Sequence, residues 1–330
     1  MPRRSHCRQR HGVMENGFTG GLTLAEAYFR ETALPALRRE FPELAERVAA
    51  GLVGNGSECF GYDDEISRDH DWGVDFFIWL TEGDARHAEG LTQWKERLFA
   101  EVPPPFSRER SQYGARVDVS TCGGFYKSLI GFERGPQALS QWRAVPEENL
   151  AMSVNGAVFI DGAGEFTATR RYLLGYFPED LRLKRIAAHC MALAQTGQYN
   201  YDRCAKRGDA VAAYTVIAKF IESAVALVFL LNRVFRPYYK WAHRKMAELP
   251  ILGERAGGLL RRVALAGAGR ESSEDTVRSC VSEMCAMFAD ELGRQGLSST
   301  DDWFLTSHAE QVREKISDGY MLSLPTQYLV

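Results

Sequence analysis

The chain has 330 residues, of which 45% are hydrophobic and 25% are charged, and its formal net charge is −3. This length suits one large domain or two smaller ones, and we expect two. A chain with so small a net charge lacks the basic field that drives nonspecific binding to phosphate backbones, so nucleic acid is not an expected partner. The cysteines are odd in number and form no CxxC pair, which favours a reducing cytoplasm.

The N-terminus and the most apolar segment carry no signal for export or membrane insertion. The start, MPRRSHCRQRHG, is basic, but no apolar segment follows it. We expect residues 1–20 to form a disordered leader. The longest nearly uninterrupted apolar run, 223–231, is shorter than the ~18 residues that a membrane span needs. We therefore expect a buried helix there, a cytoplasmic protein and no membrane partner.

The first half of the chain mixes helical and strand patterns. Apolar residues recur at steps of three or four near the N-terminus, and later segments alternate or are continuously apolar. The predicted elements are a helix over 24–49 that is interrupted near Pro35 or Pro42, a strand over 49–54, a strand over 69–80, a helix over 82–101 and a strand over 115–121. These elements predict a small mixed β-sheet with flanking helices.

From about Arg170 onward, the pattern changes to long helical segments. The predicted helices span 179–196, 207–235, 237–248, 255–266, 273–294 and 305–317. The sequence thus predicts an α+β protein with a catalytic domain over 21–168, followed by an α-helical bundle domain over 169–330.

Acidic residues gather just before the second predicted strand. Successive side chains of a strand point to opposite faces, so Asp69 and Asp71 would point the same way and His70 toward the core. Two converging carboxylates repel each other unless a divalent cation accepts oxygen ligands from both. Asp118 of the third predicted strand adds another carboxylate if the two strands pair. The pattern predicts a Mg²⁺ site at one edge of the sheet.

A Gly-Ser turn lies shortly before these carboxylates. Gly56 allows the backbone to approach a ligand closely, and exposed amides together with the Ser57 hydroxyl are good donors to phosphate oxygens. A turn that binds outer phosphates, next to carboxylates that hold magnesium, suits in-line displacement at phosphorus. We therefore expect a nucleoside triphosphate, ATP or another NTP, as a substrate.

One spacing in the chain resembles the signature of the polymerase-beta-like nucleotidyltransferase superfamily, whose members include kanamycin and lincosamide nucleotidyltransferases. It consists of Gly56-Ser57, eleven intervening residues, an Asp-His-Asp triplet and a later strand with Asp118. The resemblance covers about a quarter of the chain. It implies that Gly56 and Ser57 bind the triphosphate, that Asp69 and Asp71 hold two Mg²⁺ ions, and that Asp118 completes the metal site or acts as a base.

Three longer stretches resemble a bacterial branch of that superfamily that is catalogued as a domain of unknown function. They are GSECFGYDDEISRDHDWG, GQYNYDRC and FLLNRVFRPYYKW. The chain departs from the superfamily at His70, where a hydrophobic residue is usual, and in a strongly acidic loop that includes Asp63 and Asp64. We interpret these two loop aspartates as capping groups of the Asx-turn type.

The helical half supplies charged residues on an apolar helix. At 100 degrees per residue, Lys219, Glu222 and Arg233 fall within one narrow sector. One interpretation is an ion pair between Lys219 and Glu222 at one-turn spacing. The other is a stripe that lines a cleft, with Lys219 neutralising triphosphate and Glu222 contacting the acceptor.

Two aromatic segments, 196–204 and 236–241, combine rings with polar groups. Such mixtures suit stacking on a base and hydrogen bonding to phosphate or ribose, and they equally suit an ordinary helix junction. On the first interpretation Tyr199, Asn200 and Lys240 bind nucleotide and Arg203 binds acceptor.

Together these features predict an enzyme that moves a nucleoside monophosphate, most simply AMP from ATP, onto a hydroxyl of a small-molecule acceptor and releases pyrophosphate. The acidic loop favours a cationic acceptor. Two alternatives are a protein-modifying adenylyltransferase and a noncatalytic nucleotide-binding regulator. A homodimer is compatible with the sequence, which does not determine the oligomeric state.

Overall fold

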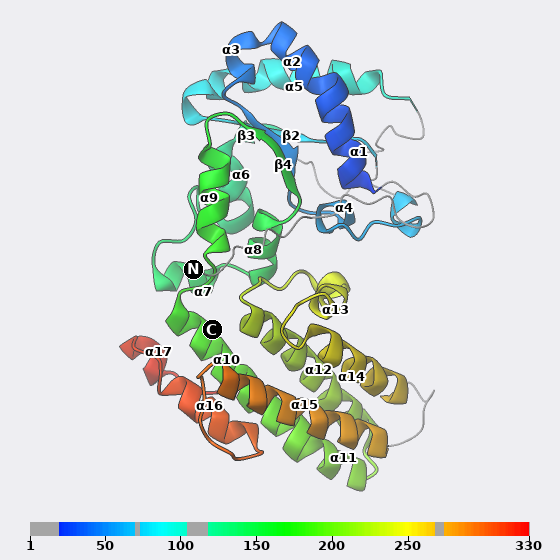
Figure 1. Ribbon diagram of the computed structural model, residues 1–330, viewed down its shortest axis with the longest axis vertical. Helices are drawn as coiled ribbons and strands as arrows, with labels where there is room; N and C mark the ends of the chain where they lie inside the picture. Colours follow the sequence, from blue (N-terminus) through cyan, green and yellow to red (C-terminus); the bar gives the residue numbers. More distant parts are fainter. Residues whose placement is uncertain (1–19, 70–72, 104–117, 268–273, 330) are drawn as a thin grey trace, which may run out of the picture. The chain divides into compact units, whose positions relative to one another are not determined.

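The computed structural model describes residues 20–69, 73–103, 118–267 and 274–329, with the backbone alone at 68 and 69. It confirms an α+β protein that is mostly helical and contains one mixed four-stranded sheet (Figure 1). The chain divides into two compact units. We call residues 1–135 and 152–175 the sheet unit, and residues 136–151 and 176–330 the helical unit.

The sheet has the strand order β3-β2-β1-β4. Strand β1 pairs antiparallel with both β2 and β4, whereas β2 pairs in parallel with β3. The strands are β1 (Ala49–Leu52), β2 (Phe77–Leu80), β3 (Val119–Thr121) and β4 (Ala157–Asp161). A parallel pair needs a crossover, and here the helix α5 (Ala88–Ala100) supplies it between β2 and β3.

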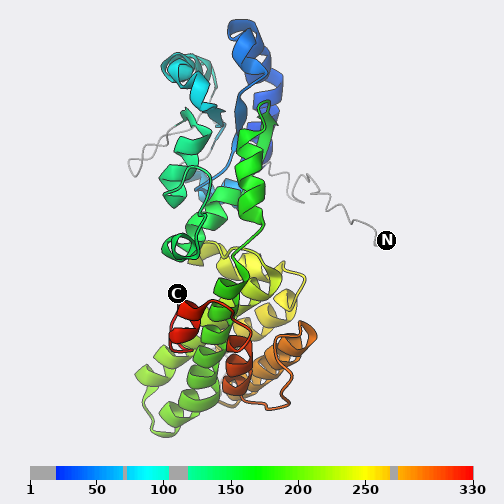
Figure 2. The ribbon, with the colours of Figure 1, turned by 90° about the vertical axis from the view of Figure 1, so that its left-hand side faces the viewer.

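Helices cover both faces of the sheet, and β2 is therefore buried on both sides (Figures 1 and 2). On one face, Phe76 contacts Phe29, which follows α1, and Phe99 of α5. On the other face, Trp79 contacts Phe125 of α6 and Phe166 of α9. The helical elements of this unit are α1 (Gly21–Tyr28), a π-helical turn (Phe29–Ala33), α2 (Leu34–Glu40), α3 (Pro42–Ala45), α4 (Ser57–Phe60), 3₁₀ turns (Ile66–Asp69 and Glu82–His87), α5, α6 (Cys122–Ile130) and α9 (Glu165–Leu174).

Within the described residues, the second predicted strand is wrong at Asp69 and over 73–76. Residues Ile66–Asp69 form a 3₁₀ turn, and β2 begins only at Phe77. The Asp64 carboxylate accepts hydrogen bonds from the amides of Ile66 and Ser67, both at 3.1 Å, and this turn chemistry overrides the alternating pattern. The same contacts bear out the interpretation of Asp64 as a capping group. His70 and Asp71 lie outside the described residues.

The helical unit is a bundle centred on α10 and α12, against which α16 and the π-helical turn pack. The helices predicted over 207–235, 237–248, 255–266 and 273–294 are confirmed with ends shifted by a few residues. The elements are α7 (Leu139–Ala144), α10 (Glu179–Leu193), a π-helical turn (Ala194–Tyr201), α11 (Asp202–Lys206), α12 (Ala210–Asn232), α13 (Tyr239–Ala247), α14 (Gly253–Gly267), α15 (Glu274–Arg294), α16 (Leu305–Arg313) and α17 (Gly319–Ser323); α8 (Glu147–Val154) begins in this unit.

By length and composition alone, α12 is long and apolar enough to cross a membrane, although its longest uninterrupted apolar run is short. In its most apolar stretch, 61% of the residues are buried inside the structure, which is typical of a core helix in a soluble protein. The predicted buried helix is therefore observed.

The segment 136–151 belongs to the helical unit, whereas the sequence analysis placed it in the first domain. Trp142 explains this, because its ring contacts Phe177 and Phe235 of the bundle. The predicted boundary between 168 and 169 falls inside α9.

Candidate functional site

The sheet register brings three chain segments to one edge. Because β1 and β2 are antiparallel, with Gly51 opposite Phe77, the end of β1 lies beside the start of β2. Because β2 and β3 are parallel, with Ile78 opposite Val119, the start of β3 lies there too. We call this the carboxylate edge. It gathers the turn after β1, the residues before β2, and Asp118 before β3.

The turn after β1, Gly54 to Ser57, has an unusual backbone held by a distant side chain. Gly54 and Gly56 have φ of 119° and 124°, a region that favours glycine. The Asn155 amide fixes the turn, because its Nδ2 donates to Gly54 O at 2.7 Å and its Oδ1 accepts from Gly54 N at 2.8 Å. Among the described residues the Ser57 hydroxyl makes no hydrogen bond, so it is available to a ligand.

A buried lysine lies between two carboxylates at this edge. Lys95 Nζ of α5 is 2.9 Å from Asp75 Oδ1 and 3.3 Å from Asp118 Oδ2. The Lys95 side chain is only 2% exposed, and the rings of Phe76 and Phe99 lie 5.2 and 5.0 Å from its Nζ. One ammonium thus lies within ion-pair distance of two carboxylates.

The predicted carboxylate set is described only in part. Asp118 directly precedes β3, and β3 pairs with β2, which was the condition for Asp118 to reach this edge. The side chain of Asp69 and all of Asp71 lie outside the described residues. Asp69 ends a 3₁₀ turn, so strand alternation does not set its direction, and that geometric argument is wrong. Among the described side chains, no group of three or more His, Cys, Asp or Glu residues forms a metal site.

The acidic loop beside the turn has structural roles at two positions. Asp63 is buried, and its Oδ2 accepts a hydrogen bond from Gly21 N at 2.6 Å, where α1 begins. Cys59 is buried as well, and its thiol lies 3.6 Å from Asn55 O. Asp63, like Asp64, therefore serves the loop and its neighbouring helix.

A cavity of about 610 Å³ opens in the helical unit, formed by α12, α13 and the start of α8. We call it the helical-unit cavity. Its lining residues are Pro146, Glu147, Glu148, Ala218, Ile221, Glu222, Val225, Arg236, Pro237, Tyr239, Ala242 and His243. The volume is in the range of small-molecule sites, and the lining combines an apolar wall with a few charged groups.

Buried polar groups lie behind one wall of this cavity. Glu147 Oε1 accepts from Arg236 N at 3.0 Å, and its Oε2 is 3.8 Å from Arg236 Nε. Burial raises the pKa of the Glu147 carboxyl, while the nearby charges of Arg185 and Arg236 oppose that rise. Burial, together with those two guanidinium groups, lowers the pKa of His189 to about 3, so its imidazole is neutral near pH 7.

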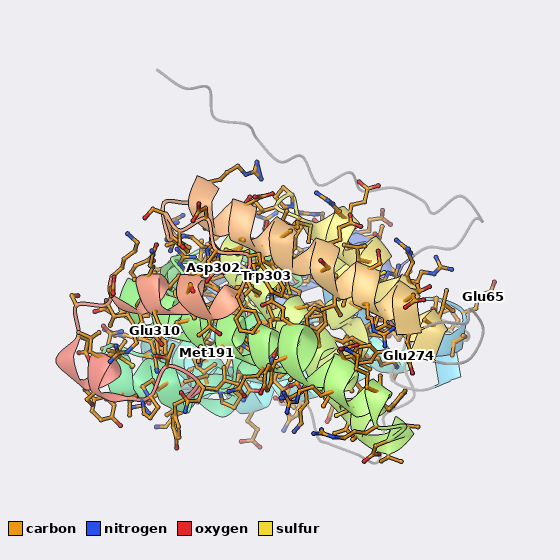
Figure 3. The ribbon with its side chains drawn as sticks, turned by 90° about the horizontal axis from the view of Figure 1, so that it is seen from below. Glu65, Met191, Glu274, Asp302, Trp303 and Glu310 are labelled. Carbon is orange, nitrogen blue, oxygen red and sulfur yellow. The ribbon has the colours of Figure 1, made fainter. Side chains whose placement is uncertain are left out.

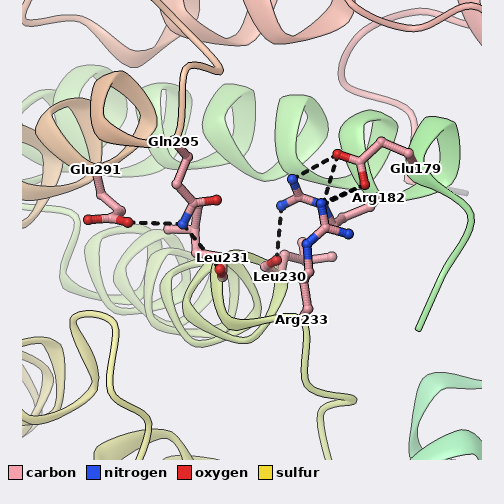
Figure 4. Close-up of polar contacts among 7 residues, drawn as sticks. All are labelled: Glu179, Arg182, Leu230, Leu231, Arg233, Glu291 and Gln295. Carbon is pink, nitrogen blue, oxygen red and sulfur yellow. Dashed lines mark hydrogen bonds and ion pairs between the residues drawn. The ribbon is translucent and has the colours of Figure 1, made fainter. Parts of the chain in front are cut away.

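The predicted charged stripe on α12 does not exist as one surface. Arg233 lies beyond the end of α12 with φ 53° and pairs with Glu179 at 2.8 Å (Figure 4). Lys219 and Glu222 are both exposed, and no ion pair joins them within the described chain. Of the three, Glu222 lines the helical-unit cavity.

The end of α12 instead receives side chains from two other segments. Arg182 Nη1 of α10 donates to Leu230 O at 3.2 Å, and Gln295 Nε2, just after α15, donates to Leu231 O at 3.1 Å (Figure 4). These contacts satisfy carbonyls that a helix leaves unpaired at its C-terminus. Arg233 therefore belongs to the end of α12.

The segment 196–204 has the contacts of a helix junction. Gln198 Nε2 donates to Trp303 O at 2.7 Å, and its Oε1 accepts from Leu305 N at 2.9 Å, so it ties the π-helical turn to the start of α16 (Figure 3 labels Trp303). Gly197 faces Phe220 so closely that a Cβ there would lie 2.5 Å from the ring. The tight fit at Gly197 explains why this turn has glycine.

The residues predicted to bind ligand in the helical half lie at separate places. Tyr199 and Arg203 stack on each other, with Arg203 Cζ 4.7 Å from the ring centre, near the start of α12. Lys240 lies in α13, beyond the other end of α12, with its Nζ 5.0 Å from the Trp241 ring centre (Figure 1). Asn200 is half-buried in the π-helical turn. These four residues do not form one site around α12.

Several residues of these two sites were missed in the sequence. Lys95 shares the apolar stripe of its helix with Leu91 and Trp94, and a lysine at such a position is a detectable signal. Asp75 occupies the same alternating positions as Asp69 and Asp71, and no pattern in the sequence distinguishes it as a partner of Lys95. The role of Asn155 has no local signal, because its partner Gly54 is 101 positions away.

One family model matches the chain. It is described as Domain of unknown function (DUF4037) and covers residues 142–242. The matched segment contains Asn155 and every lining residue of the helical-unit cavity except His243. No curated protein and no solved structure matches the chain.

Proposed function

We propose that the protein is a metal-dependent nucleotidyltransferase, which moves a nucleoside monophosphate, AMP from ATP in the simplest case, onto a hydroxyl of a small-molecule acceptor. One observation carries this proposal: the strand pairing gathers the Gly54–Ser57 turn and Asp118 at a single edge of a small mixed sheet. This arrangement supports the resemblance to the polymerase-beta-like superfamily, which needs a phosphate-binding turn and carboxylates side by side.

The donor set at the carboxylate edge fits magnesium in kind. Carboxylate oxygens are the hard ligands that Mg²⁺ prefers, and Asp118 brings one to this edge. Asp69, Asp71 and Asp118 would hold the ions. When bound, magnesium neutralises the triphosphate and polarises the phosphorus under attack.

The chain's own residues supply binding and proton transfer. The Ser57 hydroxyl and the amides of the turn orient the outer phosphates, and Asn155 keeps that turn in place. Asp118 accepts the proton of the acceptor hydroxyl, whose oxygen forms a bond to the α-phosphorus as the bond to the pyrophosphate oxygen breaks. Lys95 holds the Asp118 carboxylate in position.

Substitution of the aspartates tests this proposal. We expect Asp69→Asn and Asp71→Asn each to lower pyrophosphate release from ATP by ~100-fold or more, because each removes a charge that acts on the triphosphate. Glu65→Gln, an exposed acid of the same loop, is the matched control and should stay near the wild-type rate. Wild-type turnover in either aspartate variant would contradict the metal assignment.

A noncatalytic nucleotide sensor is the second candidate, because Lys95 already neutralises part of the Asp118 charge. It predicts Mg²⁺-dependent ATP binding without pyrophosphate release in a broad acceptor screen. Incubation with labelled ATP and cell lysate distinguishes transfer to a macromolecule from transfer to a small-molecule acceptor. Label in macromolecules would indicate a protein-modifying adenylyltransferase, and label in small solutes would indicate the proposed activity.

A further inference from the structure

The charges around the helical-unit cavity are not balanced. Three carboxylates line it, those of Glu147, Glu148 and Glu222, and Arg236 is the one arginine among the described residues of the lining. Glu147 is committed to Arg236, both through the backbone amide and through the guanidinium. Within the described chain, neither Glu148 nor Glu222 forms an ion pair. Two carboxylates without an ion-pair partner among the described residues therefore flank the cavity.

The rest of the lining is apolar and aromatic. Ala218, Ile221 and Val225 come from α12, and they occupy successive turns of one helix face together with Glu222. Across the cavity Tyr239 is 78% exposed, and its ring lies 4.2 Å from that of Tyr238. Exposed tyrosine rings attract organic cations, and the aliphatic wall accepts an apolar body.

Buried polar groups, Tyr176, Arg185 and His189, lie near Glu147 and Arg236 of the cavity lining, and we call them the cavity floor. Tyr176 and His189 are buried near Arg185, and their hydroxyl and Nδ1 have no hydrogen-bond partner among the described residues. Glu147 lies near Tyr176 and also lines the cavity. Because Glu147 is held by Arg236, the two exposed glutamates, Glu148 and Glu222, remain for a ligand.

We propose that the helical-unit cavity binds an organic ammonium ion with an apolar or aromatic body, whose positive charge lies between Glu148 and Glu222. Such a ligand matches the sign of the unpaired charge, the aliphatic wall and the tyrosine ring together. We assign the ligand to the acceptor. That role rests on the proposed function, whereas binding to the cavity does not.

Calorimetric titration of the full chain without ATP tests binding. Tryptamine, tyramine and phenethylamine are the cationic probes, and indole-3-acetate, 4-hydroxyphenylacetate and phenylacetate are their anionic counterparts. We expect at least one amine to bind tenfold or more tightly than its counterpart. If no amine binds, or if a carboxylate binds as tightly as its amine, the inference is wrong.

Variants locate the bound amine. Glu148→Gln and Glu222→Gln should each weaken amine binding threefold to tenfold, and Ala218→Trp should abolish it by filling the cavity from an exposed position. Glu254→Gln on α14, an exposed acid of the same unit outside the cavity, is the control and should bind as the wild type does. Unchanged binding in both cavity glutamate variants would overturn the inference.

Pyrophosphate release with tyramine, which carries a hydroxyl, separates the two proposals. Release that depends on tyramine, and that Glu222→Gln weakens through a higher KM, supports both. Binding without release leaves the cavity assignment standing and contradicts the acceptor role. Release with other acceptors, in a protein that binds none of the amines, contradicts the cavity assignment and leaves the proposed function standing.

Discussion

The carboxylate edge of the sheet unit and the cavity of the helical unit differ in how their buried charges are paired. At the edge, one ammonium serves two carboxylates, Asp75 and Asp118. Behind the cavity, one carboxylate, Glu147, lies near two guanidinium groups. Among the described residues in these contacts, carboxylates outnumber the cation at the edge, whereas guanidinium groups outnumber the carboxylate behind the cavity. Our two proposals follow this contrast: magnesium binds at the edge, and an organic cation binds at the rim of the cavity.

The largest expected effect is at the edge. Lys95→Met leaves two carboxylates without their buried partner, and we expect the free energy of unfolding of the sheet unit to fall by about 3–5 kcal/mol. Lys127→Met is the matched control, because Lys127 and Glu133 are 64% and 56% exposed and such pairs are worth ~1 kcal/mol or less. Hydrogen exchange of α5 amides measures both.

Magnesium sharpens this experiment. If the edge takes a cation, millimolar Mg²⁺ should protect α5 more in Lys95→Met than in the wild type, because the variant has lost its internal counter-charge. Equal losses in Lys95→Met and Lys127→Met would show that the two pairs are equally solvated, and the contrast between edge and surface would fail.

The next effect concerns the cavity floor. The pKa of His189 is lowered in the folded protein, so below pH 6.5 the unfolded chain binds a proton that the folded chain does not. Stability is complete above that pH and should fall by about 1.4 kcal/mol per pH unit toward pH 4, through His189 alone. The difference in slope between the wild type and His189→Gln isolates this contribution from that of the carboxylates. Parallel slopes would mean that His189 is solvated.

A smaller effect separates the two arginines that share Glu179. Arg182 is 3% exposed and donates to Leu230 O, so Arg182→Met should cost about 2–3 kcal/mol. Arg233 is 49% exposed at φ 53°, and Arg233→Gly should be within ~1 kcal/mol of the wild type, because relief of the backbone offsets the lost surface pair. Urea unfolding of both variants tests this order, and a larger loss at Arg233 would reverse it.

The smallest effect is at the far end of α12. Tyr199 is 51% exposed and Arg203 lies on its surface, so a double-mutant cycle of Tyr199→Ala and Arg203→Ala should give a coupling of ~0.5 kcal/mol. A coupling above ~2 kcal/mol would indicate a shielded pair, as expected if a bound group covers it.

Local signals were sufficient for much of the fold. The helices α12 to α15 were predicted because apolar residues at helical spacing face a core, and the break at Pro42 follows from its ring and missing amide hydrogen. Alternation failed before β2, because Asp64 caps a 3₁₀ turn that a count of apolar residues does not detect. The prediction for Arg233 failed because a helical wheel assumes that the helix continues, whereas α12 ends at Asn232.

The sequence by itself determined the class of the fold, its helical second half and the placing of a Gly-Ser turn near carboxylates, because these depend on neighbours within a few positions. Only the tertiary structure decided which polar groups contact one another. Lys95 is 20 positions from Asp75, Glu147 is 89 from Arg236 and Asn155 is 101 from Gly54. Strand pairing and helix packing determine such partners. Their free energy comes from the whole core, so the sequence near either residue shows no periodic pattern that would reveal the contact.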